Sequence, residues 1–275
     1  MKPAPFDYIR CDSLDEAAGL IFETGDEARV IAGGQSLMAM LNMRLARPSV
    51  LIDFMNAEET RRVETGENML RIGAGVRQAE LLAREDLEAL NPLLAKLLPW
   101  VGHPQTRARG TICGSIAHAD PSAEIPLALC ALDGKVVLRK GRKLRRVSGA
   151  EFFLGMMLTD KAEDELIVAV EFPDLPTGSG TGFCEVGRRK GDFAIVACAA
   201  VVTKSRVRLA VGGVNDTPVV KDWDALAPED EADALNALAW SLDARGDLHA
   251  TARYRRDLVR GLGAQVLKEA RACAG

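Results

Sequence analysis

Hydrophobic periodicity predicts helices at both ends of the chain. Apolar residues recur at helical spacing over residues 14–24. Ser13 is placed to cap this helix, and Glu16 completes a capping box three positions later. Towards the other end, residues 228–242 and 252–272 have helical spacing and few β-branched residues. We therefore expect the chain to end in helices that cover a sheet.

Short apolar runs between these helices predict strands. Residues 29–32 and 49–53 flank a shorter helical run, 36–43, so they are expected to form a parallel pair. The stretch 165–172 alternates apolar and charged residues as a half-buried strand does. Further expected elements are helices over 77–84 and 125–132, strands over 70–75 and 135–139, and an antiparallel hairpin of 194–203 with 207–212.

The order of these elements predicts an α+β fold of three lobes. Residues 1–56 form the first lobe, residues 57–175 the second, and residues 176–275 a C-terminal lobe of antiparallel strands and helices. The stretch 173–182 is the best linker candidate, because proline and glycine punctuate it densely.

Composition narrows the function classes. The chain has 275 residues, of which 48% are hydrophobic and 27% charged, so it is a globular protein with a substantial core. Its net charge of −4 gives no electrostatic reason to expect nucleic-acid binding. No apolar run approaches the roughly 20 residues that span a bilayer, and the N-terminus lacks a signal-peptide pattern. We expect no membrane span and a cytoplasmic location.

The sequence indicates no metal site, and it contains one basic run. The cysteines lack C-x-x-C spacing and the histidines have no neighbouring ligand, so no metal site within this chain is expected. The run 142–146 is rich in arginine and lysine. We interpret it as a solvated strand or loop, with contact to a partner protein as the alternative.

Two small-residue turns carry the candidate chemistry. They are Ala32-Gly33-Gly34-Gln35-Ser36-Leu37 and the stretch 111–121, which begins Thr111-Ile112-Cys113-Gly114-Ser115. Glycine allows close backbone approach and positive φ, and successive N–H groups form a concave nest for anions. Neither turn matches the dinucleotide or P-loop fingerprints. A single such turn is more often only a tight turn, but two with flanking hydroxyls predict a diphosphate cradle.

Acid–base chemistry is not indicated beside these turns. His118 lies next to Asp120, but no partnered nucleophile is visible, so a hydrogen-bonded loop histidine is the better interpretation. Ser36 and Ser115 lack the surroundings of a nucleophile elbow. We assign no catalytic residue.

Several stretches together carry a family resemblance: residues 2–8, 32–37, 45–48, 102–121 and 185–194. With them the chain resembles the FAD-binding medium subunit of the molybdenum hydroxylases, which include carbon monoxide dehydrogenase and xanthine dehydrogenase. The resemblance implies a two-lobed FAD-binding fold of the vanillyl-alcohol-oxidase type, with FAD between residues 1–56 and 57–175 and the C-terminal lobe closing one side.

The resemblance also implies the cofactor-binding residues. Backbone amides of the two turns would wrap the FAD diphosphate, and acidic residues after the second turn would accept ribityl or ribose hydroxyls. Phe193 would present its ring near the isoalloxazine, with an ordinary core phenylalanine as an equal alternative. The full set is Ala32, Gly33, Gly34, Gln35, Ser36, Leu37, Thr111, Ile112, Gly114, Ser115, Asp120, Glu124, Arg189 and Phe193.

Two residues depart from the family pattern, and one of them is Ala108, which stands where many relatives have asparagine. Cys113 replaces the first glycine of the usual Gly-Gly pair. Either this position has a negative φ or its backbone is strained, and the thiol is a candidate neighbour of the flavin.

By the same resemblance, this chain would be an electron-transfer subunit in a heterotrimer, which is often dimerised. A large partner would hold molybdopterin and a small partner 2Fe-2S clusters, and FAD here would pass their electrons to an external acceptor. One alternative is a stand-alone FAD-dependent oxidoreductase, for which His118 and His103 are the only visible bases. The other is a non-catalytic assembly module that has lost the cofactor.

Overall fold

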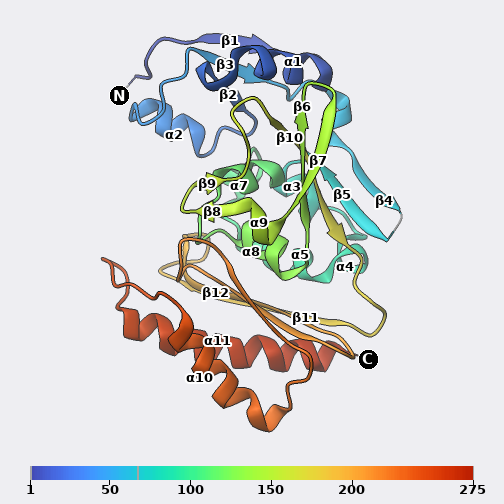
Figure 1. The fold of residues 1–275 in the computed structure, drawn as a ribbon, viewed down its shortest axis with the longest axis vertical. Coiled ribbons are helices and arrows are strands. Elements are labelled where there is room, and N and C mark those ends of the chain that lie inside the picture. The colour runs from blue at the N-terminus through green and yellow to red at the C-terminus, as the bar shows by residue number, and fades with distance from the viewer. Residues whose placement is uncertain (1, 67, 275) are drawn as a thin grey trace.

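The computed structural model describes residues 2–66 and 68–274, so the outermost residues of the first and third expected lobes, Met1 and Gly275, lie outside it. The described chain contains three main sheets of three, five and four strands and one two-stranded hairpin. Figure 1 shows the three-stranded sheet at the top, the five-stranded sheet in the middle and the four-stranded sheet at the bottom, above α10 and α11. The fold is α+β, as predicted from the sequence.

The first sheet is parallel and has the order β1-β3-β2. The predicted parallel pair is confirmed as β2 and β3, whereas β1 was missed because its four residues are mostly exposed and have no apolar run. Ser13 caps α1 as expected, but the Glu16 carboxylate accepts from the Asp12 N–H at 2.9 Å rather than from Ser13. The elements are β1 (Asp7–Arg10), α1 (Leu14–Thr24), β2 (Ala28–Ile31), α2 (Leu37–Asn42) and β3 (Val50–Asp53).

The second sheet is antiparallel with the order β4-β5-β10-β6-β7. Its middle strand β10 is buried along nearly its whole length, so the prediction of a half-buried strand over 165–172 was wrong. Its strands are β4 (Val63–Gly66), β5 (Met69–Gly73), β6 (Lys135–Lys140), β7 (Lys143–Ser148) and β10 (Leu166–Pro173). Its helices are α3 (Gln78–Leu82), α4 (Leu87–Leu90), α5 (Pro92–Leu97), α6 (Pro104–Arg107), α7 (Ile112–His118), α8 (Glu124–Ala131) and α9 (Gly149–Phe152). A small hairpin of β8 (Phe153–Gly155) and β9 (Leu158–Thr159) follows.

The third sheet is antiparallel and its strands follow one another in sequence order. It confirms the predicted hairpin as β12 and β13. The predicted linker is wrong at both ends, because Pro173 belongs to β10 and β11 begins at Gly180. A side chain at Gly180 or Gly182 would overlap with α11 backbone carbonyls, so these glycines serve close packing. The elements are β11 (Gly180–Gly187), β12 (Ala194–Val202), β13 (Val207–Gly212), β14 (Val219–Trp223), α10 (Glu231–Ser241) and α11 (Ala252–Cys273).

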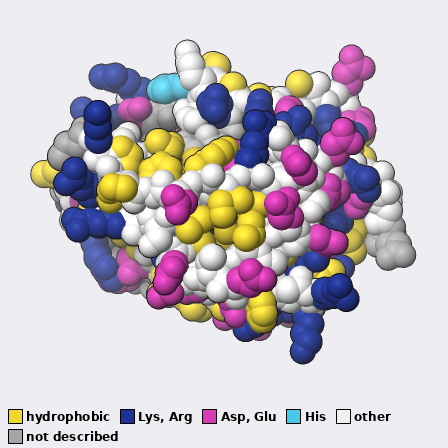
Figure 2. Space-filling view, turned by 90° about the horizontal axis from the view of Figure 1, so that it is seen from above, with side chains coloured by type: hydrophobic (Ala, Val, Ile, Leu, Met, Phe, Trp, Pro, Cys, Tyr) yellow, Lys and Arg dark blue, Asp and Glu magenta, His cyan; other side chains and the backbone are white. Residues whose placement is uncertain are grey.

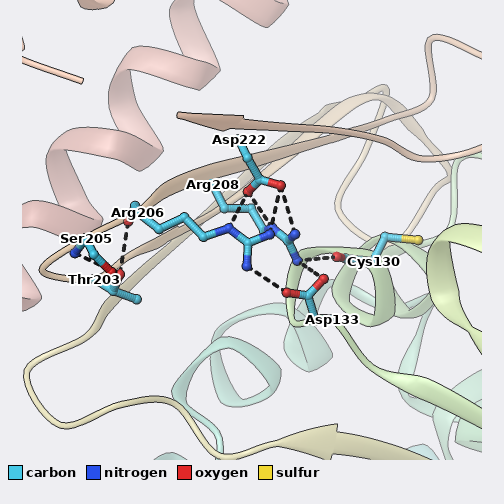
Figure 3. Close-up of polar contacts among 7 residues, drawn as sticks. All are labelled: Cys130, Asp133, Thr203, Ser205, Arg206, Arg208 and Asp222. Atoms are coloured by element: carbon cyan, nitrogen blue, oxygen red, sulfur yellow. Dashed lines mark hydrogen bonds and ion pairs between the residues drawn. The ribbon is translucent and has the colours of Figure 1, made fainter. Parts of the chain in front are cut away.

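A charged cluster fixes the third sheet against the end of α8. The guanidinium groups of Arg206 and Arg208 both bind the Asp222 carboxylate, at 2.7–2.9 Å. Arg206 also reaches Asp133, in the loop after α8, at 2.8 Å, and Arg208 pairs with the same carboxylate. Figure 3 shows both arginines between the two aspartates, with the Cys130 carbonyl beside them. Every buried charge in this joint therefore has a partner of opposite sign.

The face of the molecule above the first sheet carries charges of both signs. Figure 2 shows hydrophobic side chains grouped near the middle of this face, with lysine, arginine, aspartate and glutamate side chains around them. This face therefore presents no single-sign basic surface. Within the part of the chain that the structure describes, no helix has both the length and the apolar character needed to cross a bilayer.

Candidate functional site

A cavity of about 610 Å³ lies where the first and second sheets and the third sheet's β11–β12 loop come together. Its walls include the turn after β2, the start of α7, the first residue of α8 and the β8–β9 hairpin. The Gly191–Phe193 segment of the β11–β12 loop closes one side. The volume lies within the range of about 300–1,000 Å³ that is usual for ligand pockets.

The first predicted turn joins β2 to α2 and lines this cavity. Gly34 has φ +69°, a conformation that favours glycine. Within the described residues, no hydrogen bond uses the backbone N–H groups of residues 33–37 as donors. A row of successive free N–H groups at the wall of a cavity is a site of partial positive charge.

The first predicted turn packs against the two residues that precede the second turn. A Cβ at Gly33 would overlap with the Arg109 carbonyl oxygen and would lie 2.7 Å from Gly110 Cα. Since real Cβ atoms do not approach backbone that closely, only glycine allows this contact between the first turn and the segment that leads into α7. The expected pairing of the two turns at one site is therefore present in the fold.

The second turn begins α7 by capping. The Thr111 hydroxyl oxygen accepts from the Gly114 N–H at 2.9 Å, so this hydroxyl is used within the turn itself. Cys113 lies inside α7 and is not among the residues with positive φ, which settles the alternative in favour of a relaxed helical backbone. Its thiol faces the Ile72 carbonyl at 3.8 Å, and burial raises the pKa of the thiol to about 12. The thiol is therefore protonated at neutral pH.

Most of the predicted site residues line this one cavity: Ala32, Gly33, Gly34, Gln35, Ser36, Leu37, Thr111, Gly114, Ser115, Glu124 and Phe193. The remaining predicted residues, Ile112, Asp120 and Arg189, are not part of its lining. Ile112 is fully buried in the core. The Asp120 carboxylate accepts from the Ser122 N–H at 2.8 Å, and Arg189 is exposed in the β11–β12 loop.

Phe193 differs from a core phenylalanine. Its side chain lines the cavity and is 63% exposed, so the alternative of an ordinary core residue was wrong. An aromatic ring left this open at a cavity wall is available to an apolar partner outside the fold. A flat ligand is such a partner.

Sequence reasoning missed several lining residues. Gln78, at the start of α3, is 5% exposed and its Oε1 has no hydrogen-bond partner within the described residues, which marks it as a group available to a ligand. A polar residue on the buried side of the expected 77–84 helix was the available signal. Lys161 and the hairpin residues Met157 and Leu158 also line the cavity. No local sequence pattern predicts these three residues, because the β8–β9 hairpin and the loop before β10 bring them to the cavity from elsewhere in the chain.

Glu124 is the buried acid of the lining. It begins α8 and is 5% exposed. Burial raises the pKa of its carboxyl to about 7, the Glu124 backbone N–H acts against this, and the charge of Asp120 adds to it. Lys161 is also affected, because burial lowers the pKa of its amine below the usual value.

Comparison with known proteins gives matches along the whole chain. Residues 4–175 match the family described as "FAD binding domain in molybdopterin dehydrogenase", and residues 181–270 match "CO dehydrogenase flavoprotein C-terminal domain". The "6-hydroxypseudooxynicotine dehydrogenase complex subunit alpha" of Paenarthrobacter nicotinovorans is 36% identical over 98% of this chain and 96% of the relative. The "Nicotine 6-hydroxylase medium subunit" of the same organism is also 36% identical, over 98% and 99%. A solved carbon monoxide dehydrogenase from Hydrogenophaga pseudoflava superposes with a TM-score of 0.93 at 30% identity, over 100% of both chains.

Proposed function

Because this chain belongs to the FAD-binding medium subunits of the molybdenum hydroxylases, we propose that it is the electron-transfer subunit of such an enzyme. FAD is its cofactor, and the chain is one subunit of a multi-subunit molybdenum-containing oxidoreductase. In the proposed assembly a large partner holds molybdopterin and a small partner holds 2Fe-2S clusters. Bound FAD supplies the electron-transfer chemistry, accepting electrons from those clusters and passing them to an external acceptor.

One observation carries the placement of FAD. Residues 33–37 line the cavity, their N–H groups donate to no described residue, and Gly33 lies against the segment that leads into the second turn. A diphosphate is the part of FAD that needs such donors, since it carries negative charge and has many acceptor oxygens. The two turns together therefore fit the diphosphate, and the remaining cavity fits the ends of the cofactor.

The other walls would hold the organic parts of FAD. Phe193 offers an open aromatic face for the isoalloxazine, and Glu124 offers acceptor oxygens for hydroxyl groups. The whole proposed binding set remains Ala32, Gly33, Gly34, Gln35, Ser36, Leu37, Thr111, Ile112, Gly114, Ser115, Asp120, Glu124, Arg189 and Phe193. Of these, Ile112 would act through packing, and Asp120 and Arg189 would need to reach the cofactor at the edge of the cavity.

The protein's own contribution is binding, orientation and electrostatics. Residues 33–37 would hold the cofactor's charged centre, and the β11–β12 loop with the β8–β9 hairpin would limit water at its edge. Substrate oxidation belongs to the molybdenum partner in this proposal, so this chain needs no nucleophile or general base for it.

Purification from the native host tests this function. The preparation is examined by visible spectroscopy, and co-purifying proteins and metals are identified by mass. Flavin bands together with molybdenum and iron in larger and smaller partners support the electron-transfer subunit. Flavin without partners contradicts it and indicates a stand-alone oxidoreductase, whereas a colourless protein that FAD does not reconstitute indicates an assembly module.

A matched pair of glycine variants tests the placement of FAD. Gly33→Ala puts a methyl group into the Arg109 carbonyl, so the turns separate and flavin content falls at least tenfold. Gly19→Ala in α1 is the control, because a Cβ there meets nothing within 4 Å. Full flavin content in both variants contradicts the placement.

A further inference from the structure

Two buried glutamates, one from α8 and one from β11, have no ion-pair partner among the described residues. Glu124, at the start of α8, is 5% exposed, and Glu185, in β11, is 6% exposed. No ion pair within the described residues involves either carboxylate. The Glu185 Oε2 atom is buried and has no hydrogen-bond partner in that part of the chain.

The alternation of β11 places Glu185 on the side of the second sheet. Phe183, two residues earlier, and Ala197, paired with Glu185 across β12, both belong to the large core shared with α8. Cys184 and Val186 point the other way, into the core under α10 and α11. The Glu185 side chain therefore faces the region of α8, where Glu124 lines the cavity.

The nearest cations are occupied elsewhere. Arg107, in α6, donates to the carbonyl oxygens of Val101 and Gly102 at 2.9 and 2.8 Å. Lys190 holds its ammonium 4.9 Å above the Trp100 ring. Neither therefore forms an ion pair with the two glutamates, although each acts on one of them at longer range.

The other titratable groups around the pair do not compensate it. Asp120, just before α8, carries charge of the same sign as Glu124, and its carboxylate is held by the Ser122 N–H. Lys96 of α5 binds Glu269 of α11 at 2.5 Å, so these two neighbours of β11 neutralise each other. His103 lies against Gly191, at the far end of the β11–β12 loop.

The chemistry of two such carboxyl groups is that of a coupled pair. Burial raises the pKa of Glu185 to about 8, the negative charge of Glu124 adds to this rise, and Lys190 offsets it in part. With the pKa of Glu124 at about 7, the two groups hold at least one proton at neutral pH.

We propose that Glu124, in the wall of the FAD cavity, and Glu185, in β11 outside the lining, act as one proton-holding pair, so that adding electrons to the bound cofactor draws a proton from solution onto the pair. The inference rests on the proposed placement of FAD. Negative charge added in the cavity disfavours the ionised form of a nearby carboxyl group, which raises its pKa. The pair therefore binds a proton from water. Glu124 contacts the cofactor, and Glu185 is a positioning residue that acts through Glu124.

The pH dependence of the FAD midpoint potential tests this pair. It is measured by spectroelectrochemistry on the purified complex from pH 6 to 9. We expect the wild-type slope of potential against pH to be steeper between about pH 7 and 8.5, and Glu185→Gln to lose this extra slope. An unchanged slope in Glu185→Gln overturns the inference.

Glu163→Gln is the matched control. Glu163 also lines the cavity, but its side chain is 59% exposed and pairs with Arg29. Its substitution removes one negative charge from the same wall without touching the pair, so the potential shifts by a similar amount at every pH. Loss of the extra slope in this variant as well would assign the effect to general charge and overturn the pair.

Failure of the variants to fold is also informative. Glutamine has the shape of a protonated glutamic acid, so a group that is neutral at pH 7 tolerates it. If both Glu185→Gln and Glu124→Gln fail to fold at pH 7, the carboxylates are ionised there and the inference is wrong. Flavin retained in Gly33→Ala refutes the placement of FAD, whereas flavin loss there with an unchanged slope in Glu185→Gln refutes only the pair.

Discussion

The buried glutamates of this protein divide into two regions with opposite electrostatics. At the second sheet, Glu165, just before β10, and Glu171, within β10, are 5% and 4% exposed, and each is bound by arginine. Arg145 holds Glu165 at 2.7 Å, and Arg146 holds Glu171 at 2.9 Å. At the junction with the third sheet, Glu124 and Glu185 are equally buried and have no such partner.

The two regions differ in ionisation although burial is the same. Burial acts to raise the pKa of Glu165 and Glu171, but hydrogen bonds and charge from Arg145 and Arg146 outweigh it, so each pKa lies below its usual value. For Glu124 and Glu185 burial prevails and the pKa rises. The paired carboxylates thus stabilise the sheet through ion pairs, whereas the unpaired carboxyl groups retain a proton and form no ion pair.

Contact with the cavity is not what separates the two regions. Glu165 also lines the cavity, yet its carboxylate binds Arg145 and accepts from the Ala162 N–H. The positive charge of Lys161 acts on it in the same direction. The presence or absence of an arginine decides the outcome. Each substitution below therefore removes a partner, a charge or a proton from one region and compares the result with the other.

Removing a paired carboxylate has the largest expected effect on stability. Glu171→Gln leaves Arg146 and Arg71 without their shared partner, and we expect a loss of about 3 kcal/mol in the free energy of unfolding at pH 7. Glu185→Gln replaces a neutral acid and changes the same quantity by less than about 1 kcal/mol. Urea unfolding measures both, and equal losses would contradict the comparison.

Alkaline pH should weaken the wild-type protein through the unpaired region. A carboxyl whose folded pKa lies above its unfolded value contributes stability that is complete below the unfolded value and is lost as pH rises through the folded one. With folded values of about 7 and about 8, we expect a loss of roughly 2 kcal/mol between pH 7 and 9. Unfolding of wild type and the Glu124→Gln/Glu185→Gln double variant across this range measures it. A double variant with the same slope as wild type would count against the account.

The paired region should respond to acid in the opposite direction. Glu165 and Glu171 have lowered folded pKa values, so their stabilisation is complete above the unfolded value and is lost as pH falls through the folded one. Arg145→Met converts Glu165 into an unpaired group. We expect it to cost about 1.5 kcal/mol at pH 8 and less at pH 5, where the carboxyl takes up a proton. A cost that does not depend on pH would show that Arg145 acts only by packing.

The smallest effect is expected for an exposed carboxylate at the same cavity. Glu163→Gln removes a surface ion pair with Arg29, and such pairs contribute between about 0 and 1 kcal/mol. We expect a change in unfolding free energy within about 0.5 kcal/mol at any pH from 6 to 9. Thermal unfolding measures it, and a larger change would show that position at the cavity, rather than burial, controls these carboxylates.

Sequence patterns predicted what is local. The helix over 14–24, the parallel pair that flanks the first turn and the β12–β13 hairpin follow from periodicity, and the two glycine turns indicated the cavity. Short strands such as β1 and β14 were missed, because four or five partly exposed residues give no clear alternation. The half-buried interpretation of β10 failed since its neighbours on both sides were not known.

Long-range pairing explains what else could not be predicted. The run 142–146 was interpreted as a solvated strand or loop, but Arg145 and Arg146 there neutralise glutamates 20 and 25 residues further along the chain. Glu124 and Glu185 belong to different lobes and come into the same buried region because the third sheet packs on α8. The residues next to a glutamate in the sequence do not show whether an arginine binds it in the fold. The electrostatic difference between the two regions therefore could not be predicted without the structure.

Infrared spectroscopy of the carboxyl groups tests the central claim most directly. A protonated carboxylic acid has a C=O stretching band distinct from that of a carboxylate. We predict such a band at pH 6 that disappears by pH 9, is reduced in Glu124→Gln and Glu185→Gln, and is unchanged in Glu165→Gln. If no such band is present at pH 6, or if it persists undiminished in both unpaired variants, the buried glutamates of the two regions are ionised alike and the account is wrong.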